Sequence, residues 1–123
     1  MSLRYSGYGP RGPRHPGAGV ASCRVEAERS ADREPGLIQA ELVDLSRDGY
    51  QLRTCVPLAK GESVTLRLHD KNSGLRLALP GTVRWTRSKS DSAWLSGCQA
   101  SCELDWETLG ELFLHGILAT DGP

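Results

Sequence analysis

The residues best suited to bind a ligand form the hexapeptide 44–49, DLSRDG. The Asp44 carboxylate can accept hydrogen bonds from an N–H edge such as that of guanine, and the Ser46 hydroxyl can point the same way. Gly49 has no side chain and lets the backbone approach a flat ligand closely. The same composition also suits a tight strand-to-strand turn without any ligand, because Asp and Ser bond to their own backbone and Gly accepts a positive φ.

Two arginines form a second candidate group. Arg11 and Arg14 lie in residues 1–19, which contain five Gly and three Pro and almost no apolar side chains, so we expect a flexible arm there. A spacing of three puts their side chains on opposite faces of an extended strand but on one face of a polyproline II helix, which the prolines favour. Guanidinium groups suit phosphates and the O6/N7 edge of guanine. A solvated linker is the alternative interpretation of this arm.

The elements that must position these residues are short strands. Apolar and polar residues alternate from Val20 onward, which predicts β-strands separated by turns. The sequence 70–74, DKNSG, predicts a hairpin, and Pro80-Gly81 predicts a bulge or bend within one long strand. The hexapeptide 44–49 then lies at the junction of two strands. The predicted strands cover residues 20–27, 37–45, 51–55, 64–68, 75–85 and 94–104.

One helix follows the strands. Asp105 is a suitable N-cap, and the predicted amphipathic helix ends near Gly122-Pro123. Its apolar residues recur at helical spacing: Trp106, Leu109, Leu112, Phe113 and Ile117. About six short strands and one terminal helix predict a mostly β fold, a small closed or nearly closed barrel with the helix over an open end. A chain of 123 residues suits a single core, so we expect an arm at 1–19 and one domain at 20–123.

Charge and hydropathy exclude several classes of protein. The chain has 15 basic and 15 acidic residues, which does not suggest binding to a nucleic acid polymer. The arm is basic, and the remainder is mildly acidic, with 12 basic and 15 acidic residues beyond residue 20. No apolar run approaches the roughly 20 residues that span a bilayer, and no secretory signal is visible. We therefore expect a cytoplasmic protein without membrane insertion.

Metal binding and catalysis are not favoured either. The four cysteines show no CxxC pair, so we expect small buried apolar residues, with a four-thiolate zinc site as the alternative: Cys23, Cys55, Cys98 and Cys102. His15, His69 and His115 fall on the arm, a predicted strand and the predicted helix, and no catalytic motif groups them. The sequence therefore predicts a binding module without a cofactor rather than an enzyme.

The hexapeptide 44–49 resembles the [D/N]xSxxG motif of the PilZ domain family, with Asp44, Ser46 and Gly49 at its three defining positions. The resemblance covers nearly all of residues 20–118. PilZ domains are six-stranded β-barrels that commonly serve as receptors for the bacterial second messenger cyclic di-GMP. The resemblance thus implies a six-stranded antiparallel split barrel with a C-terminal helix. Further similar segments are QLRT at 51–54, PLAKGE at 57–62, the strand 64–68 and GTVRW at 81–85.

The family's second ligand element is an RxxxR motif in the N-terminal arm, whose arginines contact guanine faces and phosphates. Here Arg11 and Arg14 are three residues apart rather than four. The resemblance implies that these arginines bind cyclic di-GMP together with Asp44, Ser46 and Gly49, and that binding changes the arm and signals to an unidentified partner protein. The alternative is a PilZ-like adaptor that has lost nucleotide binding and works through protein contacts.

Overall fold

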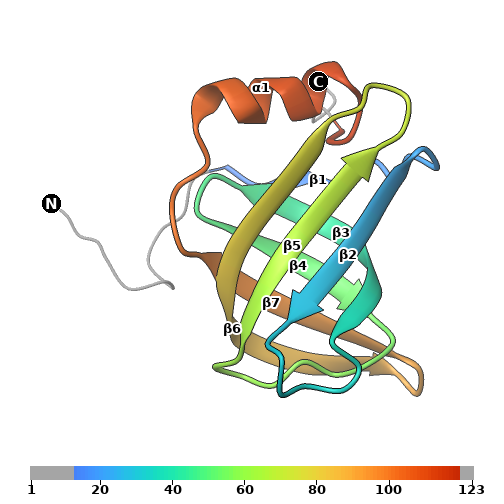
Figure 1. The fold of residues 1–123 in the computed structure, drawn as a ribbon, viewed down its shortest axis with the longest axis vertical. Coiled ribbons are helices and arrows are strands. Elements are labelled where there is room, and N and C mark those ends of the chain that lie inside the picture. Colours follow the sequence, from blue (N-terminus) through green and yellow to red (C-terminus); the bar gives the residue numbers. More distant parts are fainter. Residues whose placement is uncertain (1–12, 120–123) are drawn as a thin grey trace, which may run out of the picture.

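The computed structural model describes residues 13–119, which form seven strands and one helix (Figure 1). The elements are β1 (His15–Pro16), β2 (Cys23–Arg29), β3 (Leu37–Ser46), β4 (Gly49–Thr54), β5 (Ser63–Asp70), β6 (Arg76–Ser90), β7 (Ala93–Ala100) and α1 (Trp106–Leu114).

Strands β2 to β7 form a closed antiparallel barrel in the order β3-β2-β5-β6-β7-β4, and β3 closes it by pairing with β4. β3 has three neighbours: residues 37–39 pair with β2, residues 40–46 with β4, and residues 44–45 also with β1. β1 therefore pairs with β3 beyond the point where β2 has diverged from it. The predicted mostly β fold, a six-stranded antiparallel barrel with a C-terminal helix, is confirmed.

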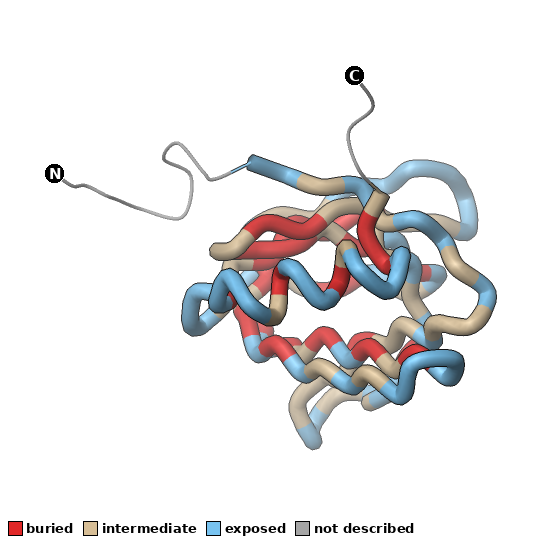
Figure 2. The backbone as a smooth tube through the Cα atoms, turned by 90° about the horizontal axis from the view of Figure 1, so that it is seen from above, coloured by how far each residue is buried: buried red, intermediate tan, exposed pale blue. Residues whose placement is uncertain are grey.

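Alternate residues of the strands form the core, as the period of two predicts. β5 buries Val64, Leu66 and Leu68 and leaves the residues between them more exposed. Helix α1 lies across one open end of the barrel and buries Leu109 and Leu112 against it (Figures 1 and 2). Each such burial stabilises the fold by about 1.5–3 kcal/mol.

The predicted start of the helix is confirmed and its predicted end is wrong. The Asp105 carboxylate accepts a hydrogen bond from the Thr108 N–H at 2.7 Å, as an N-cap does. The helix stops at Leu114, because Gly116 adopts a φ of +74° and reverses the chain. Ile117 lies after this turn and is buried there, so its apolar side chain continues the helical spacing without belonging to the helix.

The predicted break in the long strand β6 is wrong in position. Pro80-Gly81 pairs regularly with β5, and the register instead shifts between Val83 and Trp85, on the β7 side. The Pro80 carbonyl accepts a hydrogen bond from the Ser101 N–H, just past the end of β7. Pro80 has no N–H to donate on this side, but β7 has already ended there, so no hydrogen bond between β6 and β7 is lost.

Tyr50 links three strands through the core. Its hydroxyl donates to the Leu79 carbonyl at 2.9 Å and approaches the Val64 carbonyl at 3.3 Å. A Cβ on Gly81 would stand 2.8 Å from this hydroxyl, so glycine leaves room for it. Burial raises the pKa of Tyr50 well above its ordinary value, which keeps the hydroxyl protonated as a donor.

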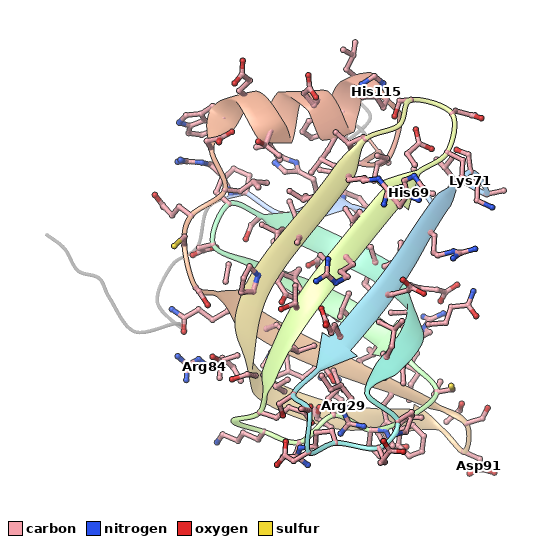
Figure 3. The ribbon with its side chains drawn as sticks, viewed as in Figure 1. Arg29, His69, Lys71, Arg84, Asp91 and His115 are labelled. Carbon is pink, nitrogen blue, oxygen red and sulfur yellow. The ribbon has the colours of Figure 1, made fainter. Side chains whose placement is uncertain are left out.

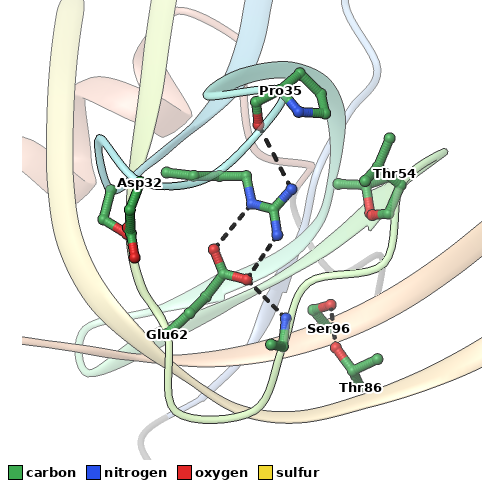
Figure 4. A network of polar contacts seen from close by, with 10 residues as sticks. Asp32, Pro35, Thr54, Glu62, Thr86 and Ser96 are labelled. Carbon is green, nitrogen blue, oxygen red and sulfur yellow. Dashed lines mark hydrogen bonds and ion pairs between the residues drawn. The ribbon is translucent and has the colours of Figure 1, made fainter.

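A buried ion pair closes the barrel end opposite α1 (Figures 3 and 4). Arg29 donates from Nε and Nη2 to the two carboxylate oxygens of Glu62, each over 2.9 Å, and the Ala59 N–H donates to the same carboxylate at 2.7 Å. The two charged side chains are only 6% and 1% exposed. Burial alone would raise the pKa of Glu62, but the bonds from Arg29 and Ala59 and the Arg29 charge outweigh burial and lower it.

Candidate ligand-binding site

The hexapeptide forms the tight connection between β3 and β4. Ser46 pairs with Gly49 across the turn, and Arg47 and Asp48 form its tip. The Ser46 hydroxyl is buried and donates to Asp48 Oδ1 at 2.7 Å. Gly49 is also buried and pairs with Gln99 of β7. In this arrangement Ser46 and Gly49 shape the turn, and Asp44 is the motif residue that is most accessible to solvent.

Asp44 is held by two partners on different elements. Arg14 Nη1 donates to Asp44 Oδ1 at 2.8 Å, and Gln51 Nε2 donates to Asp44 Oδ2 at 3.2 Å. The Arg14 side chain is 41% exposed and that of Asp44 is 18% exposed. The structure thus brings one of the two predicted arginines into contact with the first residue of the motif.

The contact exists because the end of the arm is attached to the barrel. β1 pairs with residues 44–45 of β3, and the Gly17 N–H donates to the Val43 carbonyl at 3.0 Å. A Cβ on Gly17 would stand 2.1 Å from the Leu42 carbonyl oxygen, so only glycine permits this approach. Residues 13–19 are therefore not the free arm that the sequence predicts.

The same segment also contacts the region after the helix. The His15 ring packs edge-on against Phe113 of α1, with 4.8 Å between ring centroids. The Ala18 N–H donates to the Ile117 carbonyl at 2.9 Å, and the Ala119 N–H donates to the Pro16 carbonyl at 2.8 Å. Residues 1–12, which include Arg11, lie outside the described residues, so the boundary at residue 19 and the geometry of the arginine pair stay predictions.

Arg47 at the tip of the turn connects the motif to the start of α1. Its Nε donates to the Leu104 carbonyl at 2.7 Å, and its guanidinium lies 4.0 Å above the centre of the Trp106 ring. The Leu104 N–H in turn donates to the Arg47 carbonyl at 2.7 Å. These contacts fix the turn against the segment that follows β7.

The outer face of β4, β7 and β6 continues from the motif and was missed by the sequence analysis. Gln51 is aligned with Gly97 of β7, and Gly97 with Trp85 of β6. A Cβ on Gly97 would stand 2.1 Å from Trp85 Nε1, so the indole lies directly over the glycine. Gly97 and Trp85 lie in two predicted strands that follow each other, and this was the available sign that the indole covers the glycine. Using it requires the register of the two strands, which the sequence does not reveal.

A further guanidinium lies on this face. Arg84 donates from Nε to Gln99 Oε1 at 2.7 Å, and Gln99 is the cross-strand neighbour of Gly49. Among residues 13–119, Arg84 forms no ion pair with a carboxylate. The face that continues from Asp44 and Gln51 therefore carries amide groups, an indole and a positive charge.

The cysteines do not assemble into a site in the described part of the chain. No group of His, Cys, Asp and Glu side chains there could hold a metal ion. Cys98 is buried and Cys23 half-buried, but Cys55 and Cys102 are exposed, so the expectation that all four are buried is wrong. Burial raises the pKa of the Cys98 thiol to about 12. Cys102 is exposed because β7 ends at Ala100, before the predicted end of that strand.

The fold is a six-stranded β-barrel in which an N-terminal segment crosses next to a strand-turn motif. The PilZ domain family matches the chain over residues 11–113. The chain therefore belongs to the PilZ domain family, whose members are binding and adaptor modules known for cyclic di-GMP. A search of curated proteins found no significant match. Between residues 13 and 119, no helix has the length and apolar character that a membrane crossing requires.

Proposed function

We propose that this PilZ domain is a receptor module that binds cyclic di-GMP between its N-terminal arm and the β3–β4 turn. The observation that carries the proposal is the contact between Arg14 and Asp44, 2.8 Å from Nη1 to Oδ1. It brings together a group suited to phosphates or guanine faces and a group suited to the guanine N–H edge. Both belong to segments through which PilZ domains are expected to bind the nucleotide.

The ion pair can be exchanged for ligand contacts at small cost. Ion pairs with this degree of exposure contribute about 0–1 kcal/mol to stability. On binding, Asp44 accepts from the guanine edge and Arg14 turns to a phosphate or a guanine face. Ser46 and Gly49 support this exchange by holding the turn, while Arg11 supplies the second guanidinium from the arm.

The outer face of β4, β7 and β6 extends the proposed site. Gln51 already bonds to Asp44, so its amide lies within reach of a guanine held by that carboxylate. Arg84 has no carboxylate partner among the described residues and is available to a phosphate. The half-exposed Trp85 offers a flat apolar surface on the same face.

The attachment of the arm suggests how binding signals to a partner. His15 packs on Phe113, and Ala18 bonds to Ile117, so a change in the position of the arm acts directly on the end of α1. A ligand that binds one position of the arm better shifts the population toward that position. We propose that an unidentified protein effector detects this change.

A specific observation favours the second candidate, an adaptor that acts through protein contacts alone. Two of the three large apolar side chains that are exposed in residues 13–119 lie on α1: Trp106 is 68% exposed and Leu114 76%. Such a surface serves an adaptor whether or not the nucleotide binds. The two candidates differ in their dependence on Arg14.

Titration calorimetry with cyclic di-GMP tests the proposal. We expect micromolar or tighter binding by the wild type, and a loss of about five- to 150-fold for Arg14→Ala or Asp44→Asn, the value of one good bidentate contact. Arg67→Ala is the matched control, since Arg67 is an exposed arginine on β5 that is paired with Glu28, outside the proposed nucleotide site. No binding by the wild type would favour the adaptor, and an equal loss in the control would contradict the proposed position of the site.

A further inference from the structure

A row of basic residues crosses the outer face of β2, β5 and the first part of β6, away from the part of β6 that carries Arg84 and Trp85. The register places Arg24 directly opposite His69 and His69 directly opposite Arg76. Arg24 and Arg76 are exposed and His69 is half-buried; Figure 3 shows His69 on β5. Side chains opposite each other on antiparallel strands have Cβ atoms about 4.5–5.5 Å apart, so the three form one continuous row.

The two arginines of this row are not paired with the acids nearest to them. In the part of the chain that the structure describes, neither Arg24 nor Arg76 belongs to an ion pair. The neighbouring Arg67 donates to Glu28 at 2.6 Å, and its register partner is Glu26. The two carboxylates thus lie on the Arg67 side of the row.

The row borders a hollow of about 370 Å³. Ala78 lies opposite Arg67 on β6, and its methyl group leaves space between the longer side chains around it. Arg24, His69 and Arg76 line the same hollow, as do Arg67 and the acidic Glu26. This volume falls within the range of about 300–1,000 Å³ that is typical of small-molecule pockets.

We infer that the hollow bounded by Arg24, His69 and Arg76 binds a small soluble molecule that carries a phosphate group. Guanidinium groups form paired, charge-assisted hydrogen bonds to phosphate oxygens, and an imidazole between two of them adds another donor. The arginines stand on the two outer strands of the row, where they can approach one phosphate from both sides. The inference does not depend on the proposed nucleotide site, because none of the residues proposed for that site lines this hollow.

Inorganic pyrophosphate is a suitable probe, added at constant ionic strength while ¹H–¹⁵N spectra are recorded. We expect saturable shifts at amides around residues 24, 69 and 76. Replacing both arginines in Arg24→Gln/Arg76→Gln should weaken the affinity by at least about tenfold. The control Arg53→Gln/Arg87→Gln removes the same charge at two exposed residues that do not line the hollow, and it should keep the wild-type affinity.

Other outcomes overturn the inference. Shifts that do not saturate, or that persist unchanged in Arg24→Gln/Arg76→Gln, would show only a general response to anions. Binding of the wild type to phosphatidylglycerol vesicles that pyrophosphate does not displace would assign the row to a membrane surface instead. Arg14→Ala separates this site from the nucleotide site, because it should leave the pyrophosphate shifts intact even where cyclic di-GMP binding is lost.

Discussion

Arg14 and Asp44 are 30 residues apart in the chain, yet Arg14 Nη1 donates to Asp44 Oδ1 over 2.8 Å. The pairing of β1 with β3 places the arm beside the motif, and Gln51 holds the other carboxylate oxygen at 3.2 Å. The two charged groups thus satisfy each other in this structure. Under the proposed function, ligand binding exchanges these partners for ligand contacts.

The first prediction concerns the stability of the unliganded domain. Arg14→Ala should lower the free energy of unfolding by less than about 1 kcal/mol, because the ion pair is exposed and weak. Urea unfolding followed by fluorescence measures this change. A loss of about 3 kcal/mol would mean that the contact is a structural element of the fold, and weaker nucleotide binding by the variant would then reflect unfolding.

The second prediction concerns the glycine beneath Trp85. In Gly97→Ala the new Cβ would stand 2.1 Å from Trp85 Nε1, so the indole has to move, at a cost of about 1–3 kcal/mol. Thermal unfolding measures the loss of stability, and tryptophan fluorescence reports the movement of the indole. Gly110→Ala is the control: nothing lies within 4 Å of that Cβ, and an exposed helical alanine should add about 0.5–1 kcal/mol of stability. Equal effects of the two substitutions would contradict the account of Trp85.

The third prediction concerns the buried hydroxyl. Tyr50→Phe keeps the ring but leaves the Leu79 and Val64 carbonyls without this donor, so the unfolding free energy should fall by about 1 kcal/mol. Chemical denaturation measures it. An unchanged or increased stability would show that the hydroxyl contributes nothing to holding β4 against β5 and β6.

The fourth prediction concerns pH. The pKa of Glu62 is lowered in the folded state, so its stabilising effect is complete above the ordinary glutamate pKa of about 4.3 and disappears as pH falls through the folded-state pKa. Glu62→Gln should cost about 3–5 kcal/mol at pH 7, because it leaves Arg29 buried without a countercharge. The difference between wild type and variant should shrink below pH 4.

The control for this experiment is Glu28→Gln, which breaks the exposed pair with Arg67. It should cost less than about 1 kcal/mol at any pH. If Glu62→Gln lowered the unfolding free energy as little as this control, the ion pair with Arg29 would not stabilise that end of the barrel.

Much of the fold is predictable because it rests on local patterns. The alternation of Val64, Leu66 and Leu68 predicts β5, and Asp105 predicts the start of α1. The end of α1 is not predictable in this way, since Ile117 continues the helical spacing from beyond the turn at Gly116. A periodic pattern reports which residues are buried, and a loop can bury a residue as well as a helix can.

The candidate site is less predictable, because it depends on contacts between distant segments. The composition of the hexapeptide 44–49 points to a turn with ligand chemistry, and its position between β3 and β4 agrees. The attachment of residues 13–19 depends on the space that Gly17 leaves beside Leu42, which no local pattern reveals. The alignment of Gln51 with Gly97 likewise requires the register of two strands.

The most direct test of the account is to map cyclic di-GMP binding on the wild-type domain by ¹H–¹⁵N chemical shifts. The account predicts saturable shifts at residues 14–17 of the arm, at the turn 44–51 and around Gln99 of β7, with a secondary response near Phe113. Shifts at the arm and the turn together would establish the site. No shifts at high ligand concentration, or shifts confined to surfaces away from Arg14 and Asp44, would contradict it.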